Sequence, residues 1–143
     1  MEDMALLKKI SFFKDLGRRK LRQINMLVER SAFRAGEEIV KEGTPCDAIY
    51  IIKEGSVKVV KGRRHIVDIG KGEPVGEISF IDKGLRSASV IALEDTVLIK
   101  IPAGSFEKLL AREKDLASNI YKSVAETLCH RLRETNEVLK LIV

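Results

Sequence analysis

The sequence predicts a mainly β domain of antiparallel strands with helices before and after it. Eight glycines lie between positions 36 and 84, and short runs rich in β-branched residues separate them. Short strands with frequent turns are typical of an antiparallel sandwich or barrel rather than of alternating βαβ units. Helical periodicity occurs on both sides of this region. We therefore expect one domain, with helices in residues 1–30, a β-roll in 31–101 and C-terminal helices in 102–141.

The composition fits a single folded domain. The chain has 143 residues, 45% of them apolar and 33% charged, which argues against disorder. Aromatic residues make up 5% and Trp is absent, so we expect an aliphatic core. The net charge of +5 permits an anionic partner without requiring one.

Several classes of protein are excluded by what the sequence lacks. No apolar run is long enough to span a membrane, and the first ten residues do not resemble a signal peptide. Cys46 and Cys129 are far apart, which favours a reduced, cytoplasmic protein. His65 and His130 are too few and too isolated for a histidine-based metal site, so we expect no metal and no enzymatic activity.

The N-terminal part carries an amphipathic helical pattern over residues 18–29. Leu21, Ile24, Leu27 and Val28 fall on one face of the predicted helix. The basic residues at its start are interpreted as a solvated face rather than as a nucleic-acid patch.

Six runs in the middle of the chain are predicted as strands. Their β-branched residues and, in the clearest cases, their alternating apolar and polar residues favour extended structure. The runs are residues 38–41, 48–53, 57–60, 65–69, 87–93 and 97–101.

The C-terminal part is predicted to be helical. Pro102 opens a first helix, and residues 113–141 then contain neither Gly nor Pro. This second stretch carries one apolar stripe with spacings of three and four: Leu116, Ile120, Val124, Leu128, Leu132, Thr135, Leu139 and Ile142. Such a stripe either packs on the β body or pairs with another helix. Pairing with a second copy would give a homodimer.

Residues 76–90 carry the chemistry of an anion site. Gly76 lets the backbone approach a ligand, and the apolar residues after it fit a short helix whose N-terminus presents unpaired N–H groups. Arg86 can donate two parallel hydrogen bonds to a phosphate, and the Ser87 hydroxyl can complete the cage. Glu77 would repel a phosphate, so it suits hydrogen bonds from sugar hydroxyls.

This segment resembles the phosphate-binding cassette of the cyclic nucleotide-binding domain family. Gly76-Glu77 and Arg86-Ser87-Ala88 match the cassette, with the glutamate nine positions before the arginine as in many members. Other segments resemble the strand, turn and helix signatures of the family: 33–37, 42–43, 47–52, 55–57, 92–96 and 106–110. The resemblance covers nearly the whole chain. It implies an eight-stranded antiparallel jelly-roll β-barrel with N-terminal helices and a long C-terminal helix.

The resemblance also implies roles for individual residues. Glu77 would bind the ribose 2′-hydroxyl, Arg86 and Ser87 the cyclic phosphate, and backbone N–H groups of Gly76 and Glu77 would line the pocket. The whole expected site comprises Gly76, Glu77, Ile78, Ser79, Arg86, Ser87 and Ala88.

Two further features bear on the identity of the ligand, cyclic AMP or cyclic GMP. Ser87 after the arginine looks most like the bacterial catabolite activator type, which favours cyclic AMP. The last helix resembles the dimer helix of that type, where two residues from different subunits contact adenine. Thr135 and Asn136 fall on these positions, and an amide at 136 can pair with the adenine edge. Alternatively, both residues simply face solvent.

Three residues depart from the cassette pattern. Val75 replaces an aromatic residue and Ser79 replaces Ala or Gly, which are changes in packing. Leu85 replaces the proline before Arg86, and because proline restricts the backbone, we expect this change to loosen Arg86 and lower affinity. Taken alone, Arg86 could instead form a surface salt bridge with Glu77 or Asp82.

We expect a non-enzymatic, cytoplasmic sensor that binds a 3′,5′-cyclic nucleotide and signals through its C-terminal helix to an effector protein. The alternatives are a ligand-blind scaffold of the same fold and a sensor domain cut from a larger transcription regulator. A third alternative, a cupin-type barrel enzyme, would need clustered metal ligands, and two isolated histidines do not favour it. Residues 1–143 offer no recognition helix, so we expect no direct binding of nucleic acid, and no membrane partner. Because the chain starts with Met1, a stand-alone protein is favoured over a fragment.

Overall fold

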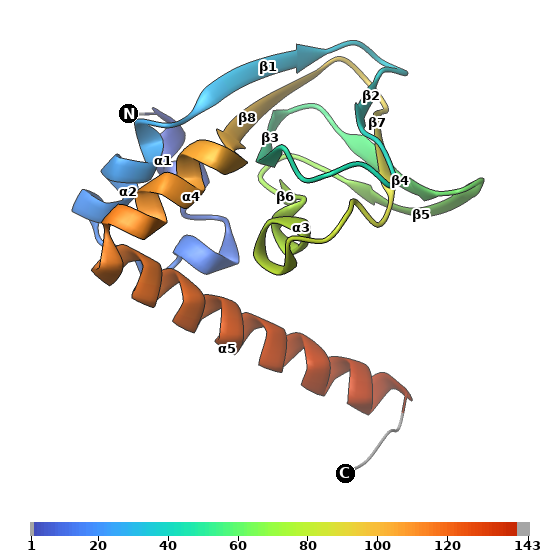
Figure 1. The fold of residues 1–143 in the computed structure, drawn as a ribbon. Coiled ribbons are helices and arrows are strands. Elements are labelled where there is room, and N and C mark those ends of the chain that lie inside the picture. Colours follow the sequence, from blue (N-terminus) through green and yellow to red (C-terminus); the bar gives the residue numbers. More distant parts are fainter. Residues whose placement is uncertain (1, 140–143) are drawn as a thin grey trace.

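The computed structural model describes the backbone of residues 2–139 and the side chains of residues 4–134 (Figure 1). The strands are β1 (Glu29–Phe33), β2 (Glu38–Val40), β3 (Ala48–Glu54), β4 (Val57–Lys61), β5 (Arg64–Ile69), β6 (Pro74–Val75), β7 (Ser89–Ala92) and β8 (Thr96–Pro102). The helices are α1 (Glu2–Leu7), the 3-10 turn η1 (Ser11–Phe13), α2 (Arg18–Asn25), α3 (Glu77–Asp82), α4 (Ala103–Arg112) and α5 (Lys114–Leu139).

The eight strands form two four-stranded sheets. Their orders are β1-β8-β3-β6 and β2-β7-β4-β5, and every pairing is antiparallel. The predicted fold, mainly antiparallel β with flanking helices and a long C-terminal helix, is confirmed. A closed barrel is not shown, since the hydrogen bonds leave two separate sheets.

Strand β3 separates two apolar cores, because successive side chains of a strand point to opposite faces. Ile49 and Ile51 face the helices, whereas Tyr50 and Ile52 face the second sheet. Residues 48–52 are therefore all buried. The core between the sheets comprises Val40, Ala48, Tyr50, Ile52, Val57, Val75, Val90 and Leu98.

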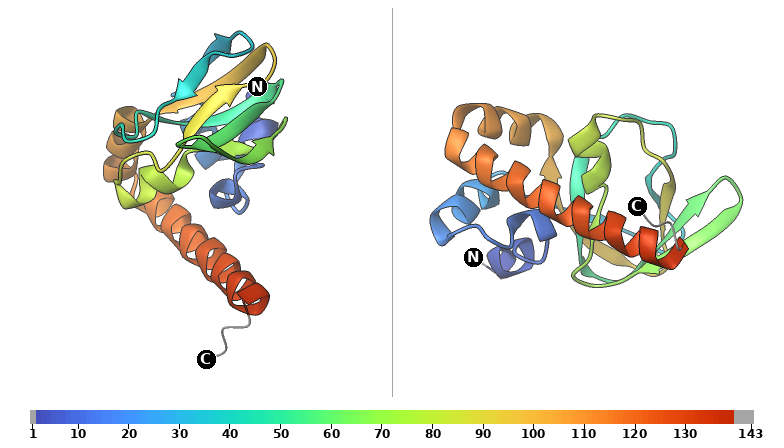
Figure 2. Two further views of the ribbon diagram at one scale, coloured as in Figure 1. Left: turned by 90° about the vertical axis from the view of Figure 1, so that its right-hand side faces the viewer. Right: turned by 90° about the horizontal axis from the view of Figure 1, so that it is seen from below.

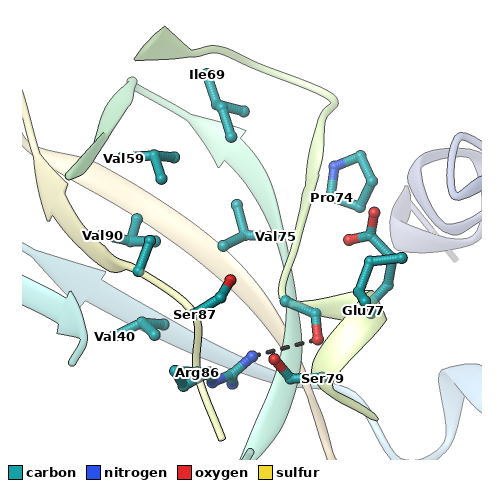
Figure 3. Close-up of a pocket in the computed structure, with 13 residues that line it drawn as sticks. Val40, Val59, Ile69, Pro74, Val75, Glu77, Ser79, Arg86, Ser87 and Val90 are labelled. Atoms are coloured by element: carbon teal, nitrogen blue, oxygen red, sulfur yellow. Dashed lines mark hydrogen bonds between the residues drawn. The ribbon is translucent and has the colours of Figure 1, made fainter. Parts of the chain in front are cut away.

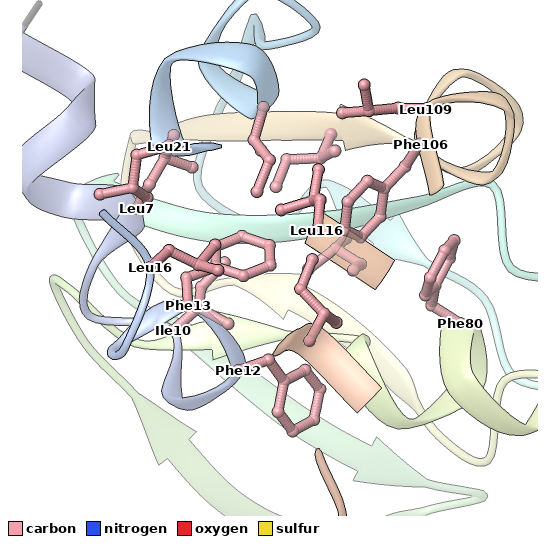
Figure 4. Packing of buried hydrophobic residues seen from close by; sticks show 14 of the residues in the cluster. Leu7, Ile10, Phe12, Phe13, Leu16, Leu21, Phe80, Phe106, Leu109 and Leu116 are labelled. Carbon is pink, nitrogen blue, oxygen red and sulfur yellow. The ribbon is translucent and has the colours of Figure 1, made fainter. Parts of the chain in front are cut away.

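The larger core lies under the helices and has aromatic residues at its centre (Figure 4). The ring of Phe106 in α4 meets Phe13 edge-on at 5.8 Å and stacks on Phe80 of α3 at 4.9 Å. Four of the five Phe residues gather here, so the core is mostly aliphatic, as expected, but has an aromatic centre. The stacking joins the short helix α3 to the C-terminal helices.

Helix α5 begins against the helical layer and runs past α3, as the views in Figure 2 show. Its first half is buried through Leu116, Ile120 and Val124, whereas Leu128 is 39% and Leu132 is 61% exposed. The predicted single stripe is therefore split into a packed half and an exposed half. None of the helices in the described part of the chain is long and apolar enough to cross a membrane.

Two strands and one helix boundary differ from the sequence prediction. Helix α2 ends at Asn25, and β1 already begins at Glu29, inside the range expected to be helical. Strand β1 alternates weakly, and β6 has only two residues. Both strands exist because they pair with distant partners, β8 and β3 respectively, which a local pattern does not reveal.

Candidate functional site

The site is built where β6 passes into α3. Gly76 turns the chain into this helix with a φ of 85°, a conformation that glycine adopts without strain. A side chain at this position would collide with the guanidinium of Arg86. The predicted short helix after Gly76 is confirmed, and both restrictions explain why this position is glycine.

The Arg86 side chain is buried, with 4% of the residue exposed. Nη1 donates to the Gly76 carbonyl oxygen at 3.2 Å, and Nη2 donates to the Ala48 carbonyl oxygen at 2.6 Å and to Asp47 Oδ1 at 3.0 Å. A guanidinium has five N–H donors, so these bonds leave donors for an anion.

The loop before β3 holds the backbone at Arg86. The Arg86 N–H donates to the Thr44 carbonyl at 2.8 Å, and the Arg86 carbonyl accepts from the Gly43 N–H at 2.9 Å. Leu85 forms an isolated antiparallel bridge with Pro45 and is 62% exposed. These contacts argue against a loosened Arg86, because backbone pairing with the loop before β3 holds the segment without a proline. The expected loss of affinity stays a prediction.

Asp47 is a site residue that reasoning from the sequence missed. Its carboxylate accepts hydrogen bonds from Arg86 and, at 3.0 Å, from the Tyr50 hydroxyl. Burial opposes ionisation, but these two bonds, a backbone hydrogen bond and the positive charge of Arg86 together lower the pKa of Asp47 below its usual value. Burial and the nearby Asp47 charge raise the pKa of Tyr50 well above its usual value, so its hydroxyl stays a donor.

The partner of Arg86 also corrects an alternative considered above. The buried guanidinium of Arg86 pairs with the largely exposed carboxylate of Asp47, not with Glu77 or Asp82. Asp82 instead accepts a hydrogen bond from the Gly84 N–H at 2.7 Å. Asp47 lies within a segment that resembles the family, but no local pattern connects it to an arginine 39 positions away.

A cavity of about 220 Å³ opens beside Arg86 (Figure 3). One wall is apolar and consists of Val40, Val59, Ile69, Pro74, Val75 and Val90. The structure brings all seven predicted site residues together on the rest of the lining: Gly76, Glu77, Ile78, Ser79, Arg86, Ser87 and Ala88. Reasoning from the sequence missed the apolar wall, since its residues come from strands that meet only in the folded chain.

Glu77 occupies the end of the pocket away from Arg86. Figure 3 shows its carboxylate beside Pro74, whereas Arg86 lies next to Ser79. The Glu77 side chain is 10% exposed, and its Oε1 lies 3.6 Å from Nη2 of Arg131 in α5. Arg131 is a second residue that reasoning from the sequence did not single out, because it lies outside the predicted helical stripe.

The remaining predicted positions lie outside the lining of this pocket or outside the residues whose side chains the structure describes. Thr135 and Asn136 belong to α5, but their side chains lie outside the described residues. His65 pairs with Asp68 of its own strand at 2.7 Å. Among the described residues, no group of three or more His, Cys, Asp or Glu could hold a metal ion.

The pocket combines three chemical features at fixed positions. Arg86 offers a buried cation, Glu77 a nearly buried acceptor, and the wall an apolar surface. Such a set fits a small ligand that has an anionic group, hydroxyl groups and a flat apolar part.

Similar proteins carry a domain of the same kind. The family profile described as "Cyclic nucleotide-binding domain" matches residues 30–113. The cGMP-dependent protein kinase of Toxoplasma gondii is 31% identical over 143 aligned residues, which cover 99% of this chain and 14% of the kinase. The cyclic AMP receptor protein of Thermus thermophilus is 32% identical over 119 residues, which cover 80% of this chain and 53% of that protein. The chain thus spans about half or less of these relatives.

Solved structures show the same arrangement of sheets and helices. The N-terminal domain of a transcriptional regulator from Streptomyces coelicolor superposes with a TM-score of 0.79 at 26% identity, covering 92% of this chain and 95% of that one. The catabolite activator protein of Thermus thermophilus gives a TM-score of 0.74 at 28% identity, covering 92% of this chain and 62% of that one. These neighbours confirm the jelly-roll-like fold.

Proposed function

The chain belongs to the cyclic nucleotide-binding domain family, and we propose that it is a sensor module whose preferred ligand is cyclic AMP. One observation carries the proposal: a buried arginine, Arg86, with donors to spare lies at one end of a cavity that has Glu77 at the other. Relatives named for cyclic AMP or cGMP support this class of ligand.

Each part of the nucleotide has a matching part of the pocket. The cyclic phosphate binds Arg86 and Ser87, where a charge-assisted hydrogen bond contributes about 1.5–3 kcal/mol. The ribose 2′-hydroxyl donates to Glu77. The purine lies against Val59 and Ile69, which line the apolar wall. Thr135 and Asn136 would contact the purine from α5.

The preference for cyclic AMP rests on Ser87, which lines the cavity directly after Arg86. Its resemblance to the bacterial catabolite activator type supports this preference. Affinities for the two nucleotides decide the point.

The output of the sensor runs through α5 to an effector protein or a second copy of the chain. Binding can shift α5 only if the nucleotide has different affinities for the two positions of the helix. The exposed half of α5, with Leu128 and Leu132, supports pairing with another helix. The module itself acts without catalysis.

Calorimetric titration of the full chain with cyclic AMP and with cyclic GMP tests the proposal. We expect saturable heat and a rise in melting temperature with cyclic AMP, and weaker binding of cyclic GMP. Absence of heat and of a thermal shift with both nucleotides up to millimolar concentration would overturn it and leave a ligand-blind scaffold.

Sedimentation of the same protein, with and without cyclic AMP, tests the pairing of helices. We expect a dimer at high protein concentration. A monomer under both conditions contradicts pairing through α5.

A further inference from the structure

The segment that follows Arg86 is held by backbone pairing at both of its ends. Arg86 itself pairs with the loop before β3, and the ladder between β4 and β7 begins at Ser89. Ser87 and Ala88 form a bend between these two paired stretches, and both line the cavity. The position of Ser87 in the cavity therefore depends on what holds this bend.

A side chain from β4 supplies the missing support. Lys61, the last residue of β4, donates from Nζ to the Ser87 carbonyl oxygen at 3.0 Å. The turn after it is tied to the same region, because the Gly62 N–H donates to Glu42 Oε1 at 3.0 Å and the Glu42 N–H donates to the Ser89 hydroxyl at 2.9 Å. These three hydrogen bonds join the β4–β5 turn, the loop after β2 and the bend.

The bond from Lys61 acts on the bend from outside the cavity. Lys61 is exposed and does not belong to the lining, whereas Ser87 does. Because a peptide unit is planar, holding the Ser87 carbonyl also fixes the direction of the N–H that follows it. The positive charge of the ammonium strengthens the hydrogen bond and polarises the peptide. One exposed side chain thus restrains the backbone that carries the Ser87 hydroxyl.

We propose that Lys61 is a positioning residue for the anionic group of the ligand. It holds the bend so that Ser87 presents its hydroxyl to the phosphate, and it does not touch the ligand itself. This inference rests on the proposed function, and it adds to the binding segment a residue from a different strand.

The first test compares Lys61→Met with Lys58→Met by calorimetry. Both changes remove one positive charge from β4, but Lys58 precedes the cavity-lining Val59 and so points to the opposite face of the strand. We expect Lys61→Met to weaken the binding of cyclic AMP by about two- to five-fold, since an exposed charged hydrogen bond is modest. Lys58→Met should change affinity little. Equal affinities for the two variants overturn the proposal.

The conservative variant separates the hydrogen bond from the length and packing of the side chain. Lys61→Arg keeps the positive charge and an N–H donor for the Ser87 carbonyl, so it should recover most of the loss. If Lys61→Arg binds as weakly as Lys61→Met, donation to the carbonyl is not the cause.

The two phosphorothioate diastereomers of cyclic AMP supply a readout that a purely structural role would leave unchanged. Each carries sulfur in place of a different exocyclic phosphate oxygen. A general loss of stability or of positive charge weakens both alike, whereas a displaced Ser87 hydroxyl changes the ratio of their affinities. We expect Lys61→Met to change this ratio and Lys58→Met to keep it. An unaltered ratio in Lys61→Met contradicts positioning.

A second background asks whether Lys61 acts through Ser87. In Ser87→Ala protein the hydroxyl that Lys61 positions is gone, so the additional change Lys61→Met should cost less affinity than in the unmodified chain. The same loss in both backgrounds would exclude the Ser87 hydroxyl as the mediator.

Hydrogen exchange tests the support of the bend without any nucleotide. The peptide that covers residues 86–90 should exchange faster in Lys61→Met than in Lys58→Met, and equal rates count against the proposal. If the unmodified chain binds no cyclic nucleotide, the proposed function fails and the role of Lys61 in binding fails with it. If it binds cyclic AMP and Lys61→Met changes neither affinity nor the diastereomer ratio, the role of Lys61 alone fails.

Discussion

The two ends of the pocket are held in different ways. At one end, the Arg86 side chain is hydrogen-bonded to Asp47, Ala48 and Gly76, and its backbone pairs with the loop before β3. At the other end, Glu77 meets a half-exposed arginine from α5 at 3.6 Å. The first end is part of the β-roll, whereas the second depends on where a helix lies.

This difference teaches how a small domain can bind a ligand and also report it. A site that was rigid throughout would bind without any change to transmit. A site that was adjustable throughout would lose affinity in ordering its side chains. Under the proposed function, the end that takes the phosphate is preorganised, and the end that takes the sugar is in contact with α5.

The largest expected effect is at the rigid end. We expect Arg86→Ala to weaken the binding of cyclic AMP by about ten- to hundred-fold, because it removes a charge-assisted pair to the phosphate. Arg86→Lys should recover part of this loss, since an ammonium keeps the charge but not the planar fork. Calorimetry measures both variants.

The matched control for this experiment is Arg63→Ala, at an exposed position between β4 and β5. It removes the same charge outside the pocket and should change affinity little. If Arg86→Ala binds as tightly as the control, the phosphate lies elsewhere and the anion end has been misassigned.

Gly76→Ala tests the geometry of the same end. The φ of 85° and the collision with the Arg86 guanidinium should lower the stability by about 1–3 kcal/mol, or roughly 3–8 °C in melting temperature, and weaken binding as well. The control is Gly104→Ala in α4, where an added Cβ meets no atom within 4 Å and helix propensity improves. Equal melting temperatures for the two variants would rule out the strain.

At the Glu77 end of the pocket, the predicted loss is smaller. Glu77→Gln keeps the shape of the side chain but removes its charge, so we expect affinity for cyclic AMP to fall by about three- to ten-fold. The unmodified chain should lose a similar factor with 2′-deoxy cyclic AMP. The variant should bind cyclic AMP and the deoxy ligand almost equally, and full additivity of the two losses would contradict a contact between Glu77 and the 2′-hydroxyl.

The smallest expected effect is on the stability of the protein at acidic pH. The folded protein lowers the pKa of Asp47 below its usual value, so the stabilisation is fully present above the unfolded pKa and disappears as pH falls through the folded pKa. Asp47→Asn should therefore show a shallower loss of stability below about pH 4, measured by thermal melts. The difference is modest because the carboxylate is 60% exposed. If the melting temperatures of the variant and of the unmodified chain fell equally with pH, this role of Asp47 would be contradicted.

Much of the architecture follows from local patterns in the sequence. The six predicted runs correspond to strands because β-branched residues and turn glycines act within a few positions. The short helix α3 follows from Gly76 and the apolar residues after it. Strands β1 and β6 escaped prediction, since their residues become strands only by pairing with β8 and β3.

The same distinction holds for the candidate site. Gly76, Glu77 and Arg86 could be found from the sequence, because a short cassette carries the glycine, the carboxylate and the guanidinium together. Asp47 and Arg131 could not, since each meets its partner across 39 and 54 positions of chain respectively. The roles of all these residues in binding a nucleotide stay predictions, which the titrations described above test.

By itself, the sequence determined the chemical groups available for a ligand and the fold class that presents them. Both depend on residue types at short spacings, because conformational preferences and local side-chain chemistry act over a few positions of chain. Only the tertiary structure decided that the guanidinium of Arg86 is buried and held by Asp47, and that α5 divides into a packed half and an exposed half. Those properties depend on which distant surfaces exclude water together, and the spacing of residues along one segment does not contain that information.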